Sequence, residues 1–247
     1  MLIEPSHEQG RQTMKLKRSF AAIVLVSAFA APVAAGTFEN AVEAHARGDY
    51  AKALRLIRPL ANDGDATAQY NLGLMYVSGL GVQQDDAAAA QWFRKSAEQG
   101  FVLAQTNLGV LCRDGRGMAQ DETEAVMWFR KAAEQGDAIA EFLLGNQYAF
   151  GKGVQQDSSE AMIWYQKAAE QGHSKAKLFL GVMYAEGRGV PQDYVRAHMW
   201  FSLSAAQGEQ KAVEALGMAE RRMTPAQIAE AQRLARDWKP ATQPPSR

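Results

Sequence analysis

The sequence has little of several residue types on which particular protein classes depend. Only one of its 247 residues is a cysteine, Cys112, so an internal disulfide and a multi-cysteine metal site are both excluded. Basic and acidic residues number 27 each, and this balance lacks the basic excess that phosphate binding needs. Proline is also scarce, with 8 residues, whereas 47% of the chain is apolar, as in ordinary globular proteins. We therefore expect a folded protein with no nucleic-acid partner.

The sequence also lacks an apolar run long enough to cross a bilayer. The run over residues 20–31 has 12 residues, too few for a membrane-spanning helix. It follows a positive patch at residues 15–18 and precedes small residues at 33–35. Because these three features occur in the order of a secretory signal, we predict a signal peptide over residues 1–35.

The exact start of this segment has two interpretations. Residues 1–13 are polar and precede the positive patch, so translation from Met14 would give a signal of ordinary length, and Met1 is the other candidate start. A buried N-terminal helix is the structural alternative to a signal. We expect a mature chain from Gly36 that is exported and soluble, with the periplasm and the outside of the cell left open.

Glycine, by contrast, is abundant, with 21 residues, and it is periodic. A Leu-Gly pair, a Gly-x-Gly pair, an aspartate and a Trp-aromatic pair all recur every 36 residues, starting in the first unit at Leu72, Gly79, Asp85 and Trp92. So many coincident columns indicate four repeats over residues 64–207. Five glycines keep the same period: Gly64, Gly100, Gly136, Gly172 and Gly208.

Each unit is predicted to form two helices. Apolar residues of the first helix share one face, and the Gly-x-Gly stretch ends it because glycine accepts a left-handed conformation. Asp85 and its equivalents Asp121, Asp157 and Asp193 are predicted N-caps of the second helix. Gly73 falls mid-helix, where glycine costs about 1 kcal/mol relative to alanine. We expect a close helix–helix approach there, with the tryptophan of the second helix filling the space.

These residues carry a family resemblance. The pattern Ala-x-x-x-Leu-Gly-x-x-Tyr-x-x-Gly-x-Gly-Val, then Asp, then Ala-x-x-Trp-aromatic, with a closing Ala-Glu-Gln-Gly, resembles the Sel-1-like repeat, a relative of the tetratricopeptide repeat. The resemblance covers residues 64–207. It implies an all-α fold, a right-handed α-solenoid of antiparallel helix pairs similar to the tetratricopeptide superhelix.

The flanks extend this organisation. Residues 36–63 resemble a degenerate N-terminal repeat, and residues 208–239 are predicted capping helices. Thr224 is the predicted N-cap of the last helix, with Pro225 at its first position. Residues 240–247 are a predicted disordered tail.

Several motifs have both a chemical and a structural interpretation. A Gly-x-Gly phosphate loop would follow a strand, whereas here a helix precedes it, which favours a structural turn. Cys112 occupies a column that holds Tyr76, Tyr148 and Tyr184, which favours a small buried side chain over a catalytic thiol. The mature chain contains no Gly-x-Ser-x-Gly or His-Glu-x-x-His motif. We therefore expect no catalytic residue, no metal and no cofactor.

By resemblance to tetratricopeptide folds, the first helices would line a concave groove. Some of these side chains have an alternative role in the core between repeats. The positions predicted to line the groove are Tyr70, Leu74, Thr106, Val110, Arg113, Phe142, Asn146, Leu178 and Val182.

The function that follows is an exported, non-catalytic scaffold that binds an unidentified protein or peptide in this groove. Two alternatives stay open. One is a cell-wall enzyme of the β-lactamase or penicillin-binding type, as claimed for cysteine-rich relatives, although their paired cysteines are absent here. The other is a structural component of an envelope assembly. The sequence names neither the partner nor the oligomeric state.

Overall fold

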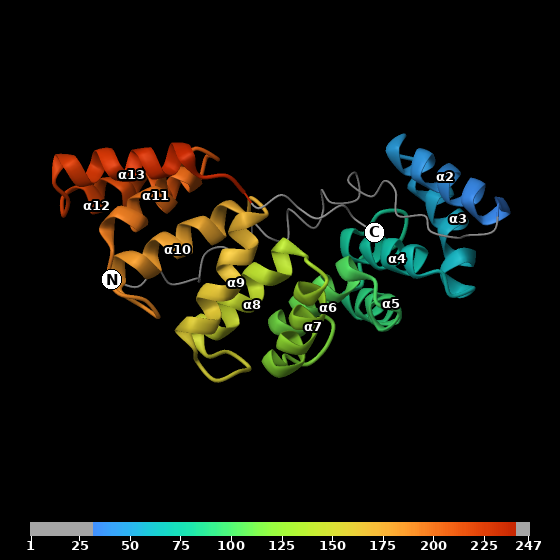
Figure 1. Cartoon of the computed structure of the whole chain (residues 1–247). Coiled ribbons are helices and arrows are strands. Elements are labelled where there is room, and N and C mark those ends of the chain that lie inside the picture. The colour runs from blue at the N-terminus through green and yellow to red at the C-terminus, as the bar shows by residue number, and fades with distance from the viewer. Residues whose placement is uncertain (1–31, 241–247) are drawn as a thin grey trace. The chain divides into compact units, whose positions relative to one another are not determined.

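The computed structural model describes residues 32–240, which form helices joined by loops and contain no strand (Figure 1). This confirms the all-α solenoid class. Most of the predicted signal peptide, residues 1–31, and nearly all of the predicted tail, residues 241–247, lie outside the described residues. Within residues 32–240, no helix is long and apolar enough to cross a membrane.

The chain divides into two compact units, Met1–Asp121 and Glu122–Arg247. The helices of the first unit are α2 (Pro32–Ala46), α3 (Tyr50–Asn62), α4 (Ala66–Ser78), α5 (Asp86–Glu98) and α6 (Val102–Asp114). Those of the second unit are α7 (Glu122–Glu134), α8 (Ala138–Phe150), α9 (Ser158–Glu170), α10 (Ser174–Glu186), α11 (Tyr194–Ala205), α12 (Gln210–Glu220) and α13 (Pro225–Asp237).

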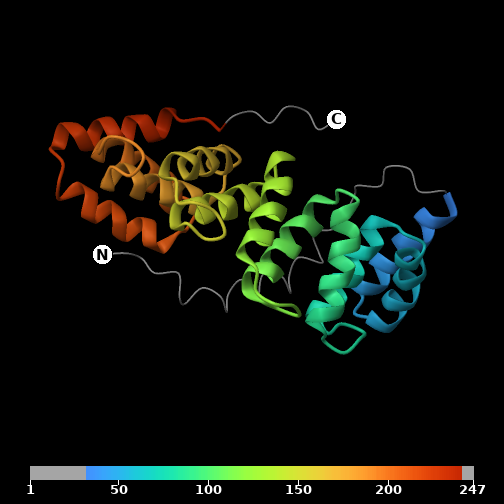
Figure 2. The ribbon, with the colours of Figure 1, turned by 90° about the horizontal axis from the view of Figure 1, so that it is seen from below.

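Within each unit, neighbouring helices in the sequence pack against each other. The pairs α2–α3 and α4–α5 form hairpins in the first unit, and α8–α9 and α10–α11 form hairpins in the second (Figure 2). The second helix of one hairpin also contacts the first helix of the next, as α3 contacts α4 and α9 contacts α10. Each unit is therefore a stack in which a repeat is stabilised by its neighbours.

The helix ends follow the predicted capping residues. Asp85 Oδ1 accepts hydrogen bonds from the backbone N–H groups of Ala87 and Ala88 at 2.9 and 3.0 Å. Asp157 and Asp193 cap α9 and α11 in the same way. The first helices α4, α6, α8 and α10 each end at a glycine in the left-handed conformation, with φ between 63° and 69°. The repeating Asp and Gly columns thus fix where each helix starts and stops.

The mid-helix glycines face an aromatic ring of the second helix. A Cβ atom added to Gly73 would lie 2.6 Å from Phe93 Cε1, and one added to Gly145 would lie 2.7 Å from Tyr165 Cδ1. Phe93 and Tyr165 are both fully buried. The expectation of a close approach is therefore confirmed, but the expectation that the tryptophan fills the space is wrong. The aromatic residue after the tryptophan points toward the first helix instead. Adjacent side chains lie about 100° apart around a helix, so the tryptophan itself faces another direction.

The second glycine of each Gly-x-Gly pair lies against the preceding repeat. A Cβ atom on Gly117 would overlap the backbone of Asp86 at the start of α5, and one on Gly153 would lie 2.8 Å from the backbone nitrogen of Thr123 in α7. In the first unit this contact is reinforced by Arg116, whose guanidinium forms two hydrogen bonds with the Asp86 carboxylate, at 2.8 and 3.0 Å. These contacts support the structural interpretation of the Gly-x-Gly motif.

The C-terminal helices cover the end of the second unit. Thr224 and Gln227 form a reciprocal capping box at the start of α13, and Pro225 is its first residue, as predicted. Helix α13 packs against α11, and the ring of Trp238 stands edge-on to Trp200, with the centroids 5.8 Å apart. The ammonium group of Lys177 lies 4.8 Å from the Trp238 ring centroid.

We predict that the substitution Gly145→Ala lowers the free energy of unfolding, although alanine is the better helix former by about 1 kcal/mol. The added methyl group would displace the buried Tyr165 ring, and overpacking of this kind costs about 1–3 kcal/mol. Gly217→Ala is the matched control, because a Cβ atom there has no neighbour within 4 Å, and it should raise stability by up to about 1 kcal/mol. Urea unfolding followed by circular dichroism compares the two. Equal stabilisation by both would contradict the close approach.

Candidate interaction surfaces

Most of the predicted groove residues of the first unit lie in its core. Tyr70, Leu74, Thr106 and Val110 are at most 8% exposed, and the side chain of Arg113 is 19% exposed. The Tyr70 ring packs against the rings of Phe93 and Phe101, with centroids 5.7 and 5.1 Å apart.

The second unit shows the same arrangement. Phe142 and Leu178 are buried, whereas Asn146 and Val182 are partly exposed. Phe142 stacks on the His173 ring at a centroid distance of 4.6 Å. Leu178 and Val182 belong to the apolar cluster that α10 forms with α11 and α12. These side chains therefore help to hold each unit together, and contact with a partner stays a prediction for all nine positions.

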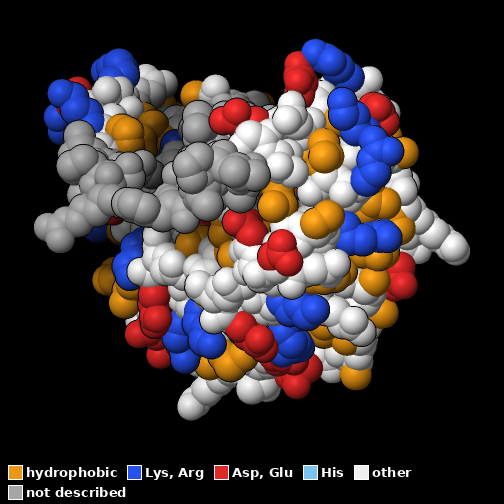
Figure 3. Space-filling model, turned by 90° about the vertical axis from the view of Figure 1, so that its right-hand side faces the viewer, with side chains coloured by type: hydrophobic (Ala, Val, Ile, Leu, Met, Phe, Trp, Pro, Cys, Tyr) orange, Lys and Arg blue, Asp and Glu red, His pale blue; other side chains and the backbone are white. Residues whose placement is uncertain are grey.

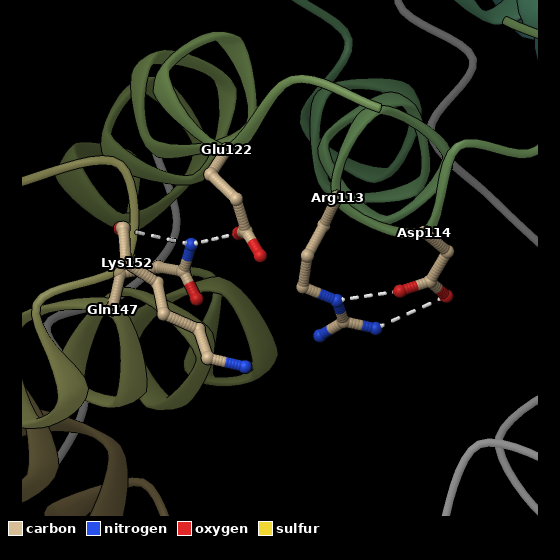
Figure 4. A network of polar contacts seen from close by, with 5 residues as sticks. All are labelled: Arg113, Asp114, Glu122, Gln147 and Lys152. Carbon is tan, nitrogen blue, oxygen red and sulfur yellow. Dashed lines mark hydrogen bonds and ion pairs between the residues drawn. The ribbon is translucent and has the colours of Figure 1, made fainter. Parts of the chain in front are cut away.

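Figure 4 shows polar contacts of Arg113 in the first unit and of Gln147, the residue after Asn146, in the second. In the first unit, the Arg113 guanidinium donates to both carboxylate oxygens of Asp114, at 2.7 and 3.2 Å (Figure 4). In the second unit, the Gln147 amide donates to Glu122 Oε2 at 2.7 Å and to the backbone carbonyl of Lys152 at 3.2 Å (Figure 4). This second group ties α7, α8 and the loop after α8 together.

Two surface hollows lie elsewhere, on the second helices. The hollow of the first unit, on α3, has a volume of about 520 Å³ and is lined by Leu54, Arg55 and Arg58 among others. The hollow of the second unit, on α7, has a volume of about 370 Å³ and is lined by Val126, Met127 and Arg130 among others. These positions were not predicted from the sequence. The signal that could have found them was the occurrence of apolar and basic residues at the same positions of two second helices, 72 residues apart.

The described residues offer few groups for chemistry. Residues 32–240 contain no cluster of three or more His, Cys, Asp or Glu side chains that could hold a metal ion. Cys112 is fully buried, with its Sγ atom 3.3 Å from Met118 Sδ. The expectations of no catalytic residue, metal or cofactor stay predictions.

The repeat model named Sel1 repeat matches this chain four times in succession, at residues 66–101, 102–137, 138–173 and 174–209. The chain belongs to the Sel1 repeat family. The matched repeats begin two residues after the predicted start at residue 64, at the first residue of each first helix.

Solved structures of Sel1 repeat proteins resemble the chain over most of its length. The crystal structure of a Sel1 repeat protein from Oxalobacter formigenes is 32% identical, with a TM-score of 0.72 over 82% of this chain and 86% of that one. A protective antigen of uropathogenic Escherichia coli strains, which displays the SLR fold, is 31% identical, with a TM-score of 0.57. That match covers 91% of this chain and 56% of the antigen. Comparison with curated protein sequences gave no match.

One column of the Sel1 repeats places polar side chains inside the stack. Its members, spaced 36 residues apart, are Gln69, Gln105, Glu141 and Lys177, and all are at most 5% exposed. Gln69 donates to the carbonyl of Ala61 at 3.1 Å and accepts from Gln99 at 2.8 Å. Glu141 accepts from the Gln171 amide at 2.8 Å. Through these bonds the column joins a first helix to the C-terminal ends of neighbouring second helices. Two of its four members, Glu141 and Lys177, are ionisable.

Burial shifts the pKa values of these two groups toward their neutral forms. It raises the pKa of the Glu141 carboxyl to about 7, against the opposing hydrogen bond from Gln171. It also lowers the pKa of the Lys177 ammonium group. Because the folded state binds the Glu141 proton more tightly than the unfolded state does, this group's contribution to stability is present at low pH and is lost as the pH rises through about 7.

We predict that Glu141→Gln stabilises the protein by on the order of 2–3 kcal/mol more at pH 8 than at pH 5, because the Glu141 carboxyl is charged in the fold at pH 8 and neutral there at pH 5. Glutamine already occupies this column at Gln69 and Gln105, so the packing is retained. Glu214→Gln on the exposed face of α12 is the control and should show no such pH dependence. Thermal unfolding at the two pH values tests this. An equal effect of Glu141→Gln at both would show that Glu141 is not buried as described.

Proposed function

We propose that this Sel1 repeat protein is an exported, non-catalytic scaffold that binds a protein or peptide partner through the face of its first helices. The observation that carries the proposal is the run of four consecutive Sel1 repeats. Proteins of this family are generally scaffolds for protein–protein interaction. Their repeats supply surface over a long stretch of chain, and recognition by such surfaces depends on shape and a few anchor side chains.

Two positions support the choice of this face. Arg113 stands in a column whose other members are Val77, Ala149 and Ala185, so the stack does not dictate an arginine there. Asn146 is the only polar member of the column formed with Leu74, Val110 and Val182, and its Oδ1 atom accepts a 2.7 Å hydrogen bond from the Tyr165 hydroxyl. Both side chains are partly exposed. Side chains that vary within a constant repeat can determine specificity without changing the fold.

The proposal of export rests on the order of the positive patch, the apolar run and the small residues at 33–35. N-terminal sequencing of the protein from the cell envelope and the culture medium should give Gly36 as the first residue. Recovery from the cytosol with Met1 or Met14 at the start would contradict export and would leave the binding proposal standing.

For the binding face, we predict that a photo-crosslinking amino acid at position 113 or 146 captures a protein partner in living cells. The same amino acid at position 214, exposed on α12, is the control and should capture none. Arg113→Ala should weaken binding of the captured partner about tenfold, as expected for an arginine anchor, and should leave thermal unfolding near that of the unmodified chain. Capture at position 214 alone, or no effect of Arg113→Ala, would place the partner on another face.

A further inference from the structure

The two surface hollows are built by the same positions of the repeat. Leu54, Arg55 and Arg58 on α3 are each 72 residues, or two repeats, before Val126, Met127 and Arg130 on α7. The correspondence extends to three further pairs of lining residues: Ala51 and Thr123, Pro59 and Lys131, and Asn62 and Glu134. The hollow of each unit therefore forms at the same positions of a second helix.

Both hollows combine an apolar part with a basic rim. Leu54 provides the apolar part in the first, and Val126 with the 42% exposed Met127 provides it in the second. Each hollow has two basic side chains and one acidic one, Arg55, Arg58 and Asp63 in the first and Arg130, Lys131 and Glu134 in the second. The face of the first unit seen in Figure 3 shows apolar side chains interspersed with both basic and acidic ones.

The cations of the first hollow are available to a ligand. Arg55 and Arg58 are exposed, and neither forms an ion pair with any residue of the described range 32–240. The first hollow therefore offers two guanidinium groups beside an apolar side chain.

The fourth Sel1 repeat lacks this combination. The equivalent positions on α11 hold His198, Met199, Ser202 and Leu203, with neither lysine nor arginine among them, and His198 is buried with its ring bonded to Glu220 at 3.1 Å. Helix α13 packs on α11. The basic rim is therefore absent from α11, the second helix that α13 covers.

We propose that these two hollows bind acidic segments of a partner protein in which an aspartate or glutamate neighbours a large apolar side chain. In the first hollow the carboxylate would pair with Arg55 or Arg58, in the bidentate geometry that guanidinium groups favour, and the apolar side chain would lie on Leu54. In the second it would pair with Lys131 or with Arg130, which also donates to the Tyr148 hydroxyl at 2.6 Å, and the apolar side chain would lie on Met127. Charge complementarity selects this occupant, since each rim is positive and each floor is apolar. The surface is distinct from the first-helix face, and its occupation does not require binding there.

A random peptide library tests this chemistry directly, because it samples acidic and non-acidic segments alike. Twelve-residue random peptides displayed on phage are selected on the full chain, and enriched peptides are synthesised and titrated by fluorescence anisotropy. We expect enrichment of sequences with Asp or Glu next to Leu, Ile, Met, Phe or Trp. The variant with Arg55→Glu, Arg58→Glu, Met127→Ser and Lys131→Glu should bind them at least tenfold more weakly.

The control variant carries Lys52→Glu and Lys211→Glu, which reverse exposed charges outside both hollows, and it should bind as the unmodified chain does. Circular dichroism melts of both variants verify folding. Methyl-labelled methionine spectra locate the site, because the Met127 signal should shift with peptide while that of Met218, 56% exposed on α12, should not.

Three results would overturn the proposal. The first is enrichment of peptides without acidic residues, or no enrichment above an unrelated protein. The second is equal peptide binding by the hollow variant and the control variant, or an unmoved Met127 signal. The third is arginine-dependent binding of the chain to phosphatidylglycerol vesicles that the selected peptides do not compete for, which would assign the hollows to a membrane surface.

Discussion

The close approach of the backbone to its neighbours, at a mid-helix glycine and at a loop glycine of the repeat, is the constraint on which the rest of this structure depends. One glycine lies mid-helix under an aromatic ring, as Gly145 lies under Tyr165, and the other places the loop on the preceding repeat, as Gly153 does on α7. The mid-helix glycine sets the spacing within a hairpin, and the loop glycine sets the spacing between hairpins. Because any side chain at either place would separate the elements, both distances are fixed by the absence of a Cβ atom.

This close packing decides which surfaces remain for a partner. A first helix is contacted by its own second helix and by the preceding one, as α4 is by α5 and α3, so most of its side chains are buried. The second helices keep one outward face, where Met127 and Ile163 are 42% and 49% exposed. Polar side chains drawn into the stack, such as Glu141 and Lys177, are held in environments that favour their neutral forms.

Much of the fold could be predicted from the sequence, because the repeat aligns equivalent residues. The 36-residue period located the helices, and local chemistry located their ends, as at Asp85 and Thr224, whose side chains bond to nearby backbone N–H groups. The prediction that tryptophan faces the mid-helix glycine is wrong, since Trp92 and Phe93 are adjacent columns and periodicity does not give the rotation of one helix about its axis.

The candidate binding positions are harder to predict, because variation among repeats does not indicate exposure. Tyr70, Thr106, Phe142 and Leu178 differ from one another and are all buried.

The stack tolerates different side chains in that column because each packs against a different set of neighbours, as Phe142 does on His173. The hollows on α3 and α7 depend on tertiary shape, which residue type and spacing alone do not supply. The packing of this column and the shape of the hollows both follow from how closely the repeats stack. The stacking is therefore the property to measure.

The central claim is that contact of the loop glycine with the preceding repeat sets the stacking. The most direct test is the difference in free energy of unfolding between Gly153→Ala and Gly136→Ala. Both glycines have positive φ, 66° and 85°, so both substitutions incur backbone strain of about 1–2 kcal/mol. Only at Gly153 would the new methyl group meet the backbone of α7, whereas at Gly136 it has no neighbour within 4 Å. We predict that Gly153→Ala costs at least about 2 kcal/mol more in urea unfolding. Equal losses would contradict the claim.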